Sequence, residues 1–209
     1  MKKIKLFVLT SFLLLSCCIG LQAINSEALY QKITTTYGGL SSFQASVKQD
    51  NYFAHVKKDI SYSGNIYFTR GKMVIKYDKP NLQRLMVNAG MVDLYDSQSK
   101  TVFRSRMRPE FGKMNPVEIL QFYWKKSTVK VLSSKGNISE VSLKPVNDPT
   151  IAHMSASINH KTGIIQSLSY ADTTGNRVKY TFSGIKTNAR IPESVWLFSL
   201  PNDVQVVEQ

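Results

Sequence analysis

Hydrophobic and polar residues alternate along most of the chain beyond residue 40. The clearest case is the segment 60–70, in which every second residue belongs to one series: Ile60, Tyr62, Gly64, Ile66, Phe68 and Arg70. The residues between them are serine, asparagine, tyrosine and threonine, which is the pattern of a half-buried β-strand. Arg70 breaks the apolar series. Because an unpaired buried charge is very costly, its guanidinium either leaves the sheet at the strand end or bonds acceptors across an apolar surface.

Further strands follow at short intervals, separated by turns such as Asn88-Ala89-Gly90 and Lys161-Thr162-Gly163. The same alternation predicts strands at 43–48, 73–77, 82–87, 92–95, 101–104, 128–132, 138–143, 154–158, 164–170, 178–182, 195–197 and 204–207. Short strands joined by tight turns favour one antiparallel sheet that curls into a barrel or half-barrel. We therefore expect a mainly β fold with a few helices packed on the sheet.

Two segments break the strand pattern and predict helices. The first is capped by Asn25 or Ser26, carries Leu29 and Ile33 on one stripe, and ends at the glycine pair 38–39. The second, 116–126, begins with a proline after Asn115, which is a good N-cap.

The second helix is apolar around nearly its whole circumference. Its apolar residues are Val117, Ile119, Leu120, Phe122, Tyr123 and Trp124. An ordinary surface helix has one apolar stripe. We therefore expect this helix either to be deeply buried or to lie over an apolar surface.

The first 23 residues have the composition of a secretory signal peptide, with three lysines before an apolar run and small residues at 16–23. The run is too short to serve as a membrane anchor. Cleavage after Ala23 would leave a single domain, residues 24–209, without cysteine, because Cys17 and Cys18 precede the cut. Alternatively, the segment 14–17 (LLSC) resembles a lipobox, and the chain would then be cut and lipidated at Cys17.

The charge balance is strongly basic. The whole chain has a formal charge of +13, and the part after residue 23 keeps 24 basic and 14 acidic residues, a charge of +10. Such an exported protein is suited to phospholipid headgroups or acidic partners. The lysines are scattered, however, and no zinc finger, basic helix or aromatic–basic RNA-binding motif occurs. We expect a solvated basic surface and no nucleic-acid partner.

No motif for catalysis or for metal or cofactor binding stands out. The histidines His55, His153 and His160 do not have the spacing of a metal site, and the sequence has no nucleophile elbow, phosphate-binding loop or dinucleotide-binding loop. The acidic residues form no close pair in a cleft-like segment. We therefore expect no enzymatic activity, no metal and no cofactor.

What remains is a curved sheet with an apolar face and two apolar helices. Such a sheet can enclose a lipid-sized cavity. Its apolar residues can equally pack as an ordinary core, which periodicity alone favours. Arg70 and the all-round apolar helix favour the cavity, because a closed dry core has little use for an inward arginine.

Five segments, in order along the chain, resemble the outer-membrane lipoprotein carrier (LolA) family. Segment 41–49 (SSFQASVKQ) is similar to S-F-x-A-x-F-x-Q, and 64–70 (GNIYFTR) to a G-x-L strand that ends in arginine. Segment 73–80 (MVIKYDKP) resembles F-x-W-x-Y-x-x-P, 85–96 a strand pair with a glycine and a tyrosine at set positions, and 196–204 (WLFSLPNDV) F-x-F-x-P-P-x-G-V. The departures are Val47 for phenylalanine, Gly71 for proline, Ile75 for tryptophan and Asp203 for glycine.

The resemblance implies an open antiparallel half-barrel covered by the N-terminal helix and a mid-chain lid helix. It implies a periplasmic chaperone that binds the acyl chains of lipoproteins in a hydrophobic cavity and carries them from the inner to the outer membrane. The implied partners are acylated lipoproteins as cargo, an inner-membrane lipoprotein-releasing ABC transporter and an outer-membrane receptor. We expect the carrier to act as a monomer.

The resemblance also assigns roles to residues. The arginine that matches Arg70 hydrogen-bonds the lid backbone in the family, and its five fixed donors suit it to be a lid latch. The expected acyl-chain cavity consists of Ile66, Phe68, Met73, Ile75, Tyr77, Leu29 and Ile33, and the expected lid residues are Val117, Ile119, Leu120 and Phe122. Three alternatives stay open: a LolA-like module that senses lipids or lipoproteins, a lipid carrier tethered through Cys17, and a module that binds a polysaccharide or the outer membrane.

Overall fold

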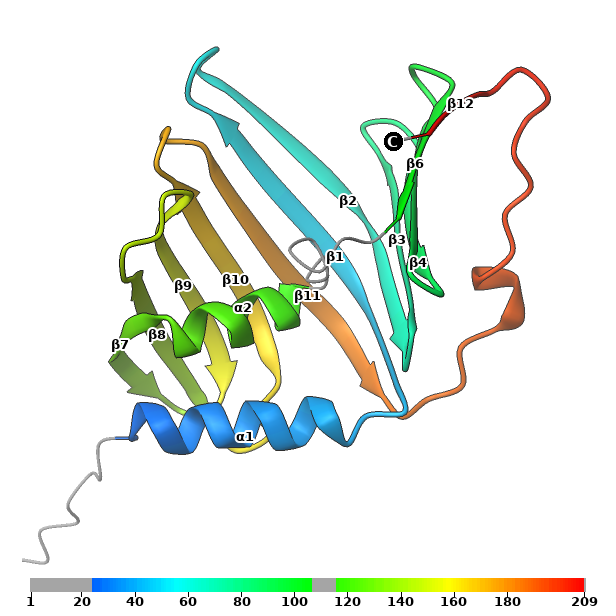
Figure 1. Cartoon of the computed structure of the whole chain (residues 1–209). Helices are drawn as coiled ribbons and strands as arrows, with labels where there is room; N and C mark the ends of the chain where they lie inside the picture. Colours follow the sequence, from blue (N-terminus) through cyan, green and yellow to red (C-terminus); the bar gives the residue numbers. More distant parts are fainter. Residues whose placement is uncertain (1–23, 107–115, 209) are drawn as a thin grey trace, which may run out of the picture.

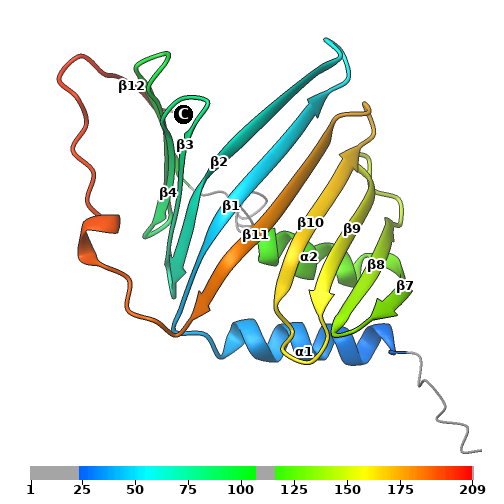
Figure 2. The ribbon, with the colours of Figure 1, turned by 180° about the vertical axis from the view of Figure 1, so that it is seen from behind.

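The computed structural model describes residues 24–106 and 116–208. One strongly curved sheet forms the body of this part, with helices α1 (Ser26–Gly38) and α2 (Pro116–Lys125) on its concave side (Figure 1). Seen from behind, α2 lies beyond the strands and α1 runs along the lower edge of the sheet (Figure 2). The predicted signal peptide, residues 1–23, lies outside the described residues.

The sheet has twelve strands among the described residues, in the order β12-β6-β5-β4-β3-β2-β1-β11-β10-β9-β8-β7. Their bounds are β1 Ser42–Phe53, β2 Lys58–Thr69, β3 Lys72–Lys79, β4 Gln83–Asn88, β5 Met91–Asp96, β6 Thr101–Arg106, β7 Ser127–Lys135, β8 Ile138–Pro145, β9 Ile151–Asn159, β10 Ile165–Asp172, β11 Arg177–Thr187 and β12 Gln205–Glu208. Neighbours are antiparallel except β12, which pairs parallel with β6. Strands β12 and β7 end the order without pairing to each other, so the predicted open half-barrel is confirmed.

Both predicted helices are present. The Asn25 side chain caps α1 by accepting a hydrogen bond from the backbone N–H of Glu27 at 2.9 Å, and the helix ends at its C-cap Gly39. Helix α2 begins at Pro116, as expected; the predicted cap Asn115 lies outside the described residues. Neither helix is long and apolar enough to cross a bilayer.

The main core lies between the helices and the concave face of the sheet. The strand register determines which side chains face this core. Val47 of β1 pairs with Gly64 of β2 and Phe182 of β11, and residues two positions away along each strand lie on the same concave face. Leu29 and Ile33 of α1 and Leu120 of α2 are almost completely buried in this core.

A second, smaller cluster lies on the convex face. Val74, Tyr95 and Val102 are buried there, where the segment between β11 and β12 runs along the outside of β3–β6 (Figure 1). Arg84 fixes this segment by donating from Nη2 to the carbonyl oxygen of Val195 at 2.7 Å. The strand predicted at 195–197 is wrong: a short 3-10 helix, η2 (Glu193–Val195), is followed by an unpaired stretch.

Candidate functional site

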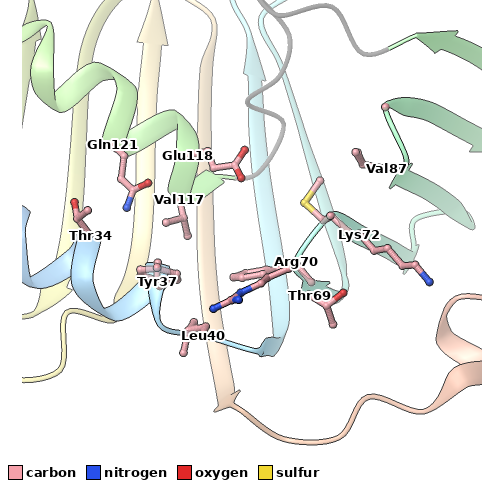
Figure 3. A pocket seen from close by; sticks show the side chains of 15 residues that line it. Thr34, Tyr37, Leu40, Thr69, Arg70, Lys72, Val87, Val117, Glu118 and Gln121 are labelled. Atoms are coloured by element: carbon pink, nitrogen blue, oxygen red, sulfur yellow. The ribbon is translucent and has the colours of Figure 1, made fainter.

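A cavity of about 580 Å³ lies where α1, α2 and the sheet meet. Its walls come from the C-terminal end of α1, the turn between β2 and β3, the β4–β5 hairpin and the first turns of α2 (Figure 3). The lining residues are Thr34, Tyr37, Gly38, Leu40, Phe68, Thr69, Arg70, Gly71, Lys72, Met73, Val87, Gly90, Val117, Glu118 and Gln121. Because these elements are far apart in sequence, the cavity is a product of the tertiary fold.

The cavity has an apolar interior and a polar rim. Leu40, Met73, Val87 and Val117 are buried side chains of its wall. The charged groups of the rim are Arg70, Lys72 and Glu118. An apolar pocket with a few polar groups at its edge is the usual form of a site for a small apolar ligand.

Tyr37 is the most constrained polar group of the wall. Its ring lies 6.0 Å from that of Phe43 and 6.4 Å from that of Phe68, while its hydroxyl accepts a hydrogen bond from the backbone N–H of Ile165 at 3.1 Å. Burial raises the pKa of this phenol well above its usual range, and the bond from Ile165 only partly opposes the shift. Tyr37 therefore stays neutral and joins the end of α1 to the sheet.

Arg70 lies one residue beyond the end of β2, in the turn to β3, and its side chain is exposed. Of the two sequence alternatives, the guanidinium has left the sheet at the strand end. It points below α2, toward Tyr37 and Leu40 (Figure 3), and no hydrogen bond or ion pair joins it to another part of the described chain. Its role as a lid latch stays a prediction.

The turn at Arg70 also explains one departure from the family pattern. Gly71 has φ of +84° with nothing within 4 Å of its missing side chain. Proline, with φ fixed near about −65°, cannot adopt this conformation. Residue 71 therefore has to be glycine, or another residue tolerant of positive φ, for the β2–β3 hairpin to close in this form.

The predicted site residues divide into two groups. Phe68, Met73 and Val117 line the cavity together with Arg70. The remaining predicted cavity residues are packed in the main core instead: Ile66, Ile75, Tyr77, Leu29 and Ile33. The remaining predicted lid residues do not line the cavity: Leu120 is buried in the main core, Ile119 packs against it, and the Phe122 ring contacts Tyr123 and Lys126.

Sequence reasoning missed several wall residues. The main ones are Tyr37, Leu40, Val87 and Gln121. The usable signals were the hairpin turn at Asn88-Ala89-Gly90, which lies at the same end of the sheet as the turn after β2 because Asn88 pairs with Lys72, and the tyrosine on the last turn of α1.

The concave face around the site carries no charge in its central rows. In β1, β8, β9 and β11, and over 60–68 of β2, 73–77 of β3 and 165–170 of β10, the paired residues that face the helices are apolar, aromatic or uncharged polar side chains. The basic residues of these strands lie on the convex face, as Lys48, Lys76 and Lys179 do. These strand segments therefore have a neutral concave face and a basic convex face.

The size of the cavity limits what it can hold. If a methylene group takes about the ~30 Å³ of a water molecule in the liquid, 580 Å³ accommodates roughly twenty methylenes. This corresponds to about one long acyl chain. No group of three or more histidine, cysteine or acidic residues within metal-binding distance occurs among the described residues.

A family model and a protein relative both relate this chain to the same family. The model of the family described as "Outer membrane lipoprotein carrier protein LolA" matches residues 38–199. An outer-membrane lipoprotein carrier protein of Ralstonia nicotianae is 29% identical over 187 residues, which cover 88% of this chain and 85% of that protein.

Two solved structures share the fold at low identity. An uncharacterized conserved protein from Thermus thermophilus has a TM-score of 0.58 at 11% identity, and the alignment covers 88% of this chain and 99% of that protein's chain. A chain of the Pseudomonas aeruginosa MucA/MucB complex has a TM-score of 0.51 at 11% identity, and the alignment covers 84% of this chain and 62% of that chain.

Proposed function

Because the chain belongs to the LolA family of outer-membrane lipoprotein carrier proteins, we propose that it is a periplasmic chaperone that shields lipoprotein acyl chains between the two membranes. The observation that carries this proposal is the cavity of about 580 Å³, which has buried apolar side chains in its wall and is bounded by two helices on the concave face of the sheet. The buried apolar side chains of its wall suit a hydrocarbon chain, which is stabilised by leaving water.

The energetics match a carrier. Burial of a methylene contributes about 0.8 kcal/mol, so ~15 methylenes contribute about 12 kcal/mol before any cost is subtracted. That value alone corresponds to roughly nanomolar affinity. A carrier must also release its cargo, so part of this free energy has to be spent on opening a closed empty state.

Helix α2 is the element proposed to open. Leu120 and Trp124 anchor it to the core, with the Trp124 ring 5.8 Å from that of Tyr30 on α1, and its N-terminal residue pair Val117 and Glu118 borders the cavity. Arg70 is proposed to hold this end closed in the empty protein through backbone acceptors near the cavity mouth. Loss of the latch would favour the open, loaded state.

The direct test is loading of the purified protein. A synthetic lipopeptide with an N-terminal diacylglyceryl cysteine is mixed with the protein, and the soluble complex is isolated by gel filtration. The mass of the complex is then measured by native mass spectrometry. We expect one lipopeptide per chain. A protein that leaves the lipopeptide in micelles or vesicles under all conditions would refute the carrier function.

The latch is tested with Arg70→Leu in the same system. We expect the variant to retain the lipopeptide about fivefold more strongly and to pass it to acceptor vesicles more slowly, because the empty closed state loses stabilisation of about 1 kcal/mol. Arg190→Leu is the matched control, since Arg190 does not line the cavity. Equal transfer rates for Arg70→Leu and the control would refute the latch.

The remaining parts of the function follow the family. We propose an inner-membrane ABC transporter as donor, an outer-membrane receptor as acceptor, action as a monomer without a cofactor, and no catalytic step. Mass spectrometry of the mature N-terminus separates the free carrier, which starts at Ile24, from a form acylated at Cys17.

A further inference from the structure

A second cluster of side chains lies on the concave face, outside the cavity. It combines two amides with four tyrosines on five adjacent strands, and we call it the tyrosine–amide patch: Gln49, Asn51, Tyr62, Tyr77, Tyr170 and Tyr180. Register places them on one face, because Gln49 pairs with Tyr62 and Tyr180, and Val178 pairs with both Asn51 and Tyr170. The curvature of the sheet turns these side chains toward one another.

Hydrogen bonds connect three side chains of the patch in one directed series. The Tyr77 hydroxyl donates to Gln49 Oε1, and Gln49 Nε2 donates to Asn51 Oδ1 at 2.9 Å. The series therefore ends on the Asn51 amide group, whose two hydrogens remain as donors.

The patch offers donors without charge. No hydrogen-bond partner within the described chain takes the Tyr62 hydroxyl, and Asn51, Tyr62 and Tyr170 are only half-buried, so a ligand can reach them. Burial raises the pKa of Tyr77 and Tyr180 above the usual range, which keeps these phenols protonated. The lack of lysine and arginine in the same rows makes the patch a poor site for a phosphate or carboxylate, which would lose hydration without gaining a counter-ion.

A row of aromatic rings connects the cavity to the patch. The ring centroids of Phe68 and Phe43 are 4.8 Å apart, those of Phe43 and Phe182 are 6.4 Å apart, and those of Phe182 and Tyr180 are 6.4 Å apart. Phe68 lines the cavity and Tyr180 belongs to the patch. A hydrocarbon chain that displaced the helices from this row would reach from the cavity to the donors.

We propose that the tyrosine–amide patch binds the uncharged ester and amide carbonyls at the head of the acylated cargo, while the chains occupy the cavity and the aromatic row. The proposal rests on the proposed carrier function and adds a polar subsite to it. Neutral donors matched to neutral acceptors would orient the cargo and would select diacylglyceryl groups over anionic lipids.

The test compares two lipopeptides of equal chain length, one with ester-linked chains and one with ether-linked chains, which lack the carbonyl oxygens. We expect the wild-type protein to bind the diester roughly tenfold more tightly, as expected for one or two lost hydrogen bonds. The variant Tyr62→Phe/Asn51→Val should bind both with the affinity of the diether. Tyr67→Phe, on the same strand but the opposite face, is the matched control and should keep the preference.

The outcomes separate the two proposals. Tight and equal binding of diester and diether by the wild type overturns the patch proposal but leaves the carrier function intact, whereas binding of neither overturns the carrier function itself. Preferential uptake of phosphatidylglycerol from vesicles also overturns the patch proposal, because an uncharged patch gains nothing from a phosphate. Circular dichroism checks folding, and Tyr62→Phe alone replaces the double variant if that variant unfolds.

Discussion

Gly64 is the position where a single methyl group should do most damage to the sheet. It lies opposite Tyr77, at a register shift between β2 and β3. A Cβ at this residue would lie 1.9 Å from the carbonyl oxygen of Lys76 and 2.7 Å from the Cα of Tyr77. Both are backbone atoms, so no rotamer change can relieve the contact, and β3 has to move away from β2.

The magnitude of the effect follows from that contact. Overpacking in a core costs about 1–3 kcal/mol when side chains can adjust. Since here only the backbone can yield, we expect Gly64→Ala to lower the free energy of unfolding by about 3 kcal/mol or more. At about 2–4 °C per kcal/mol for a domain of this size, the melting temperature should fall by roughly 6–12 °C.

The assay is urea unfolding followed by far-ultraviolet circular dichroism. Gly38→Ala is the control, because Gly38 has space on all sides and a side chain there meets nothing within 4 Å. We expect the control to change stability by less than about 1 kcal/mol. A Gly64→Ala protein as stable as the control would refute the argument that β3 needs glycine opposite Tyr77.

Two further predictions concern the helices that border the cavity. Leu120→Ala should cost about 2–5 kcal/mol in urea unfolding, because Leu120 is fully buried and its loss leaves a void; a smaller loss would mean that α2 is loosely docked. Tyr37→Phe should cost about 1 kcal/mol at neutral pH through the lost bond from Ile165. Burial raises the pKa of Tyr37 in the folded protein, so the contribution of this phenol to folding stability is complete below about pH 10 and is lost as the pH rises further. The urea midpoint of Tyr37→Phe should therefore fall less steeply at alkaline pH than that of the wild type. Equal slopes would contradict this.

The sequence predicted the strands and helices well where local chemistry determines them. Alternation with a period of two located β2, and the Asn25 cap with the glycine pair 38–39 located α1. The strand predicted at 195–197 failed for a physical reason. This segment packs Trp196 and Phe198 on the convex side, near Lys72 and Arg84, without any partner strand to hydrogen-bond its backbone. The alternation of apolar and polar residues indicates which side chains are buried. It does not indicate whether a neighbouring strand is present to pair with the backbone.

The site was predicted only in part because its walls depend on where the helices lie. Ile66, Phe68 and Ile75 all face the concave side, as their period requires. Phe68 lines the cavity, while the other two are covered as part of the main core. Which inward residues stay accessible is decided by α1 and α2, whose positions over the sheet cannot be read from the alternation itself.

Arg70 shows how exposure sets the strength that a latch can have. A guanidinium at an exposed turn keeps most of its hydration, and exposed charged contacts contribute about 0–1 kcal/mol. A latch of about 1 kcal/mol biases the empty state roughly fivefold. Against about 12 kcal/mol from a buried acyl chain, such a bias cannot prevent loading. It can only ease release, so Arg70→Leu is expected to change transfer far more visibly than uptake.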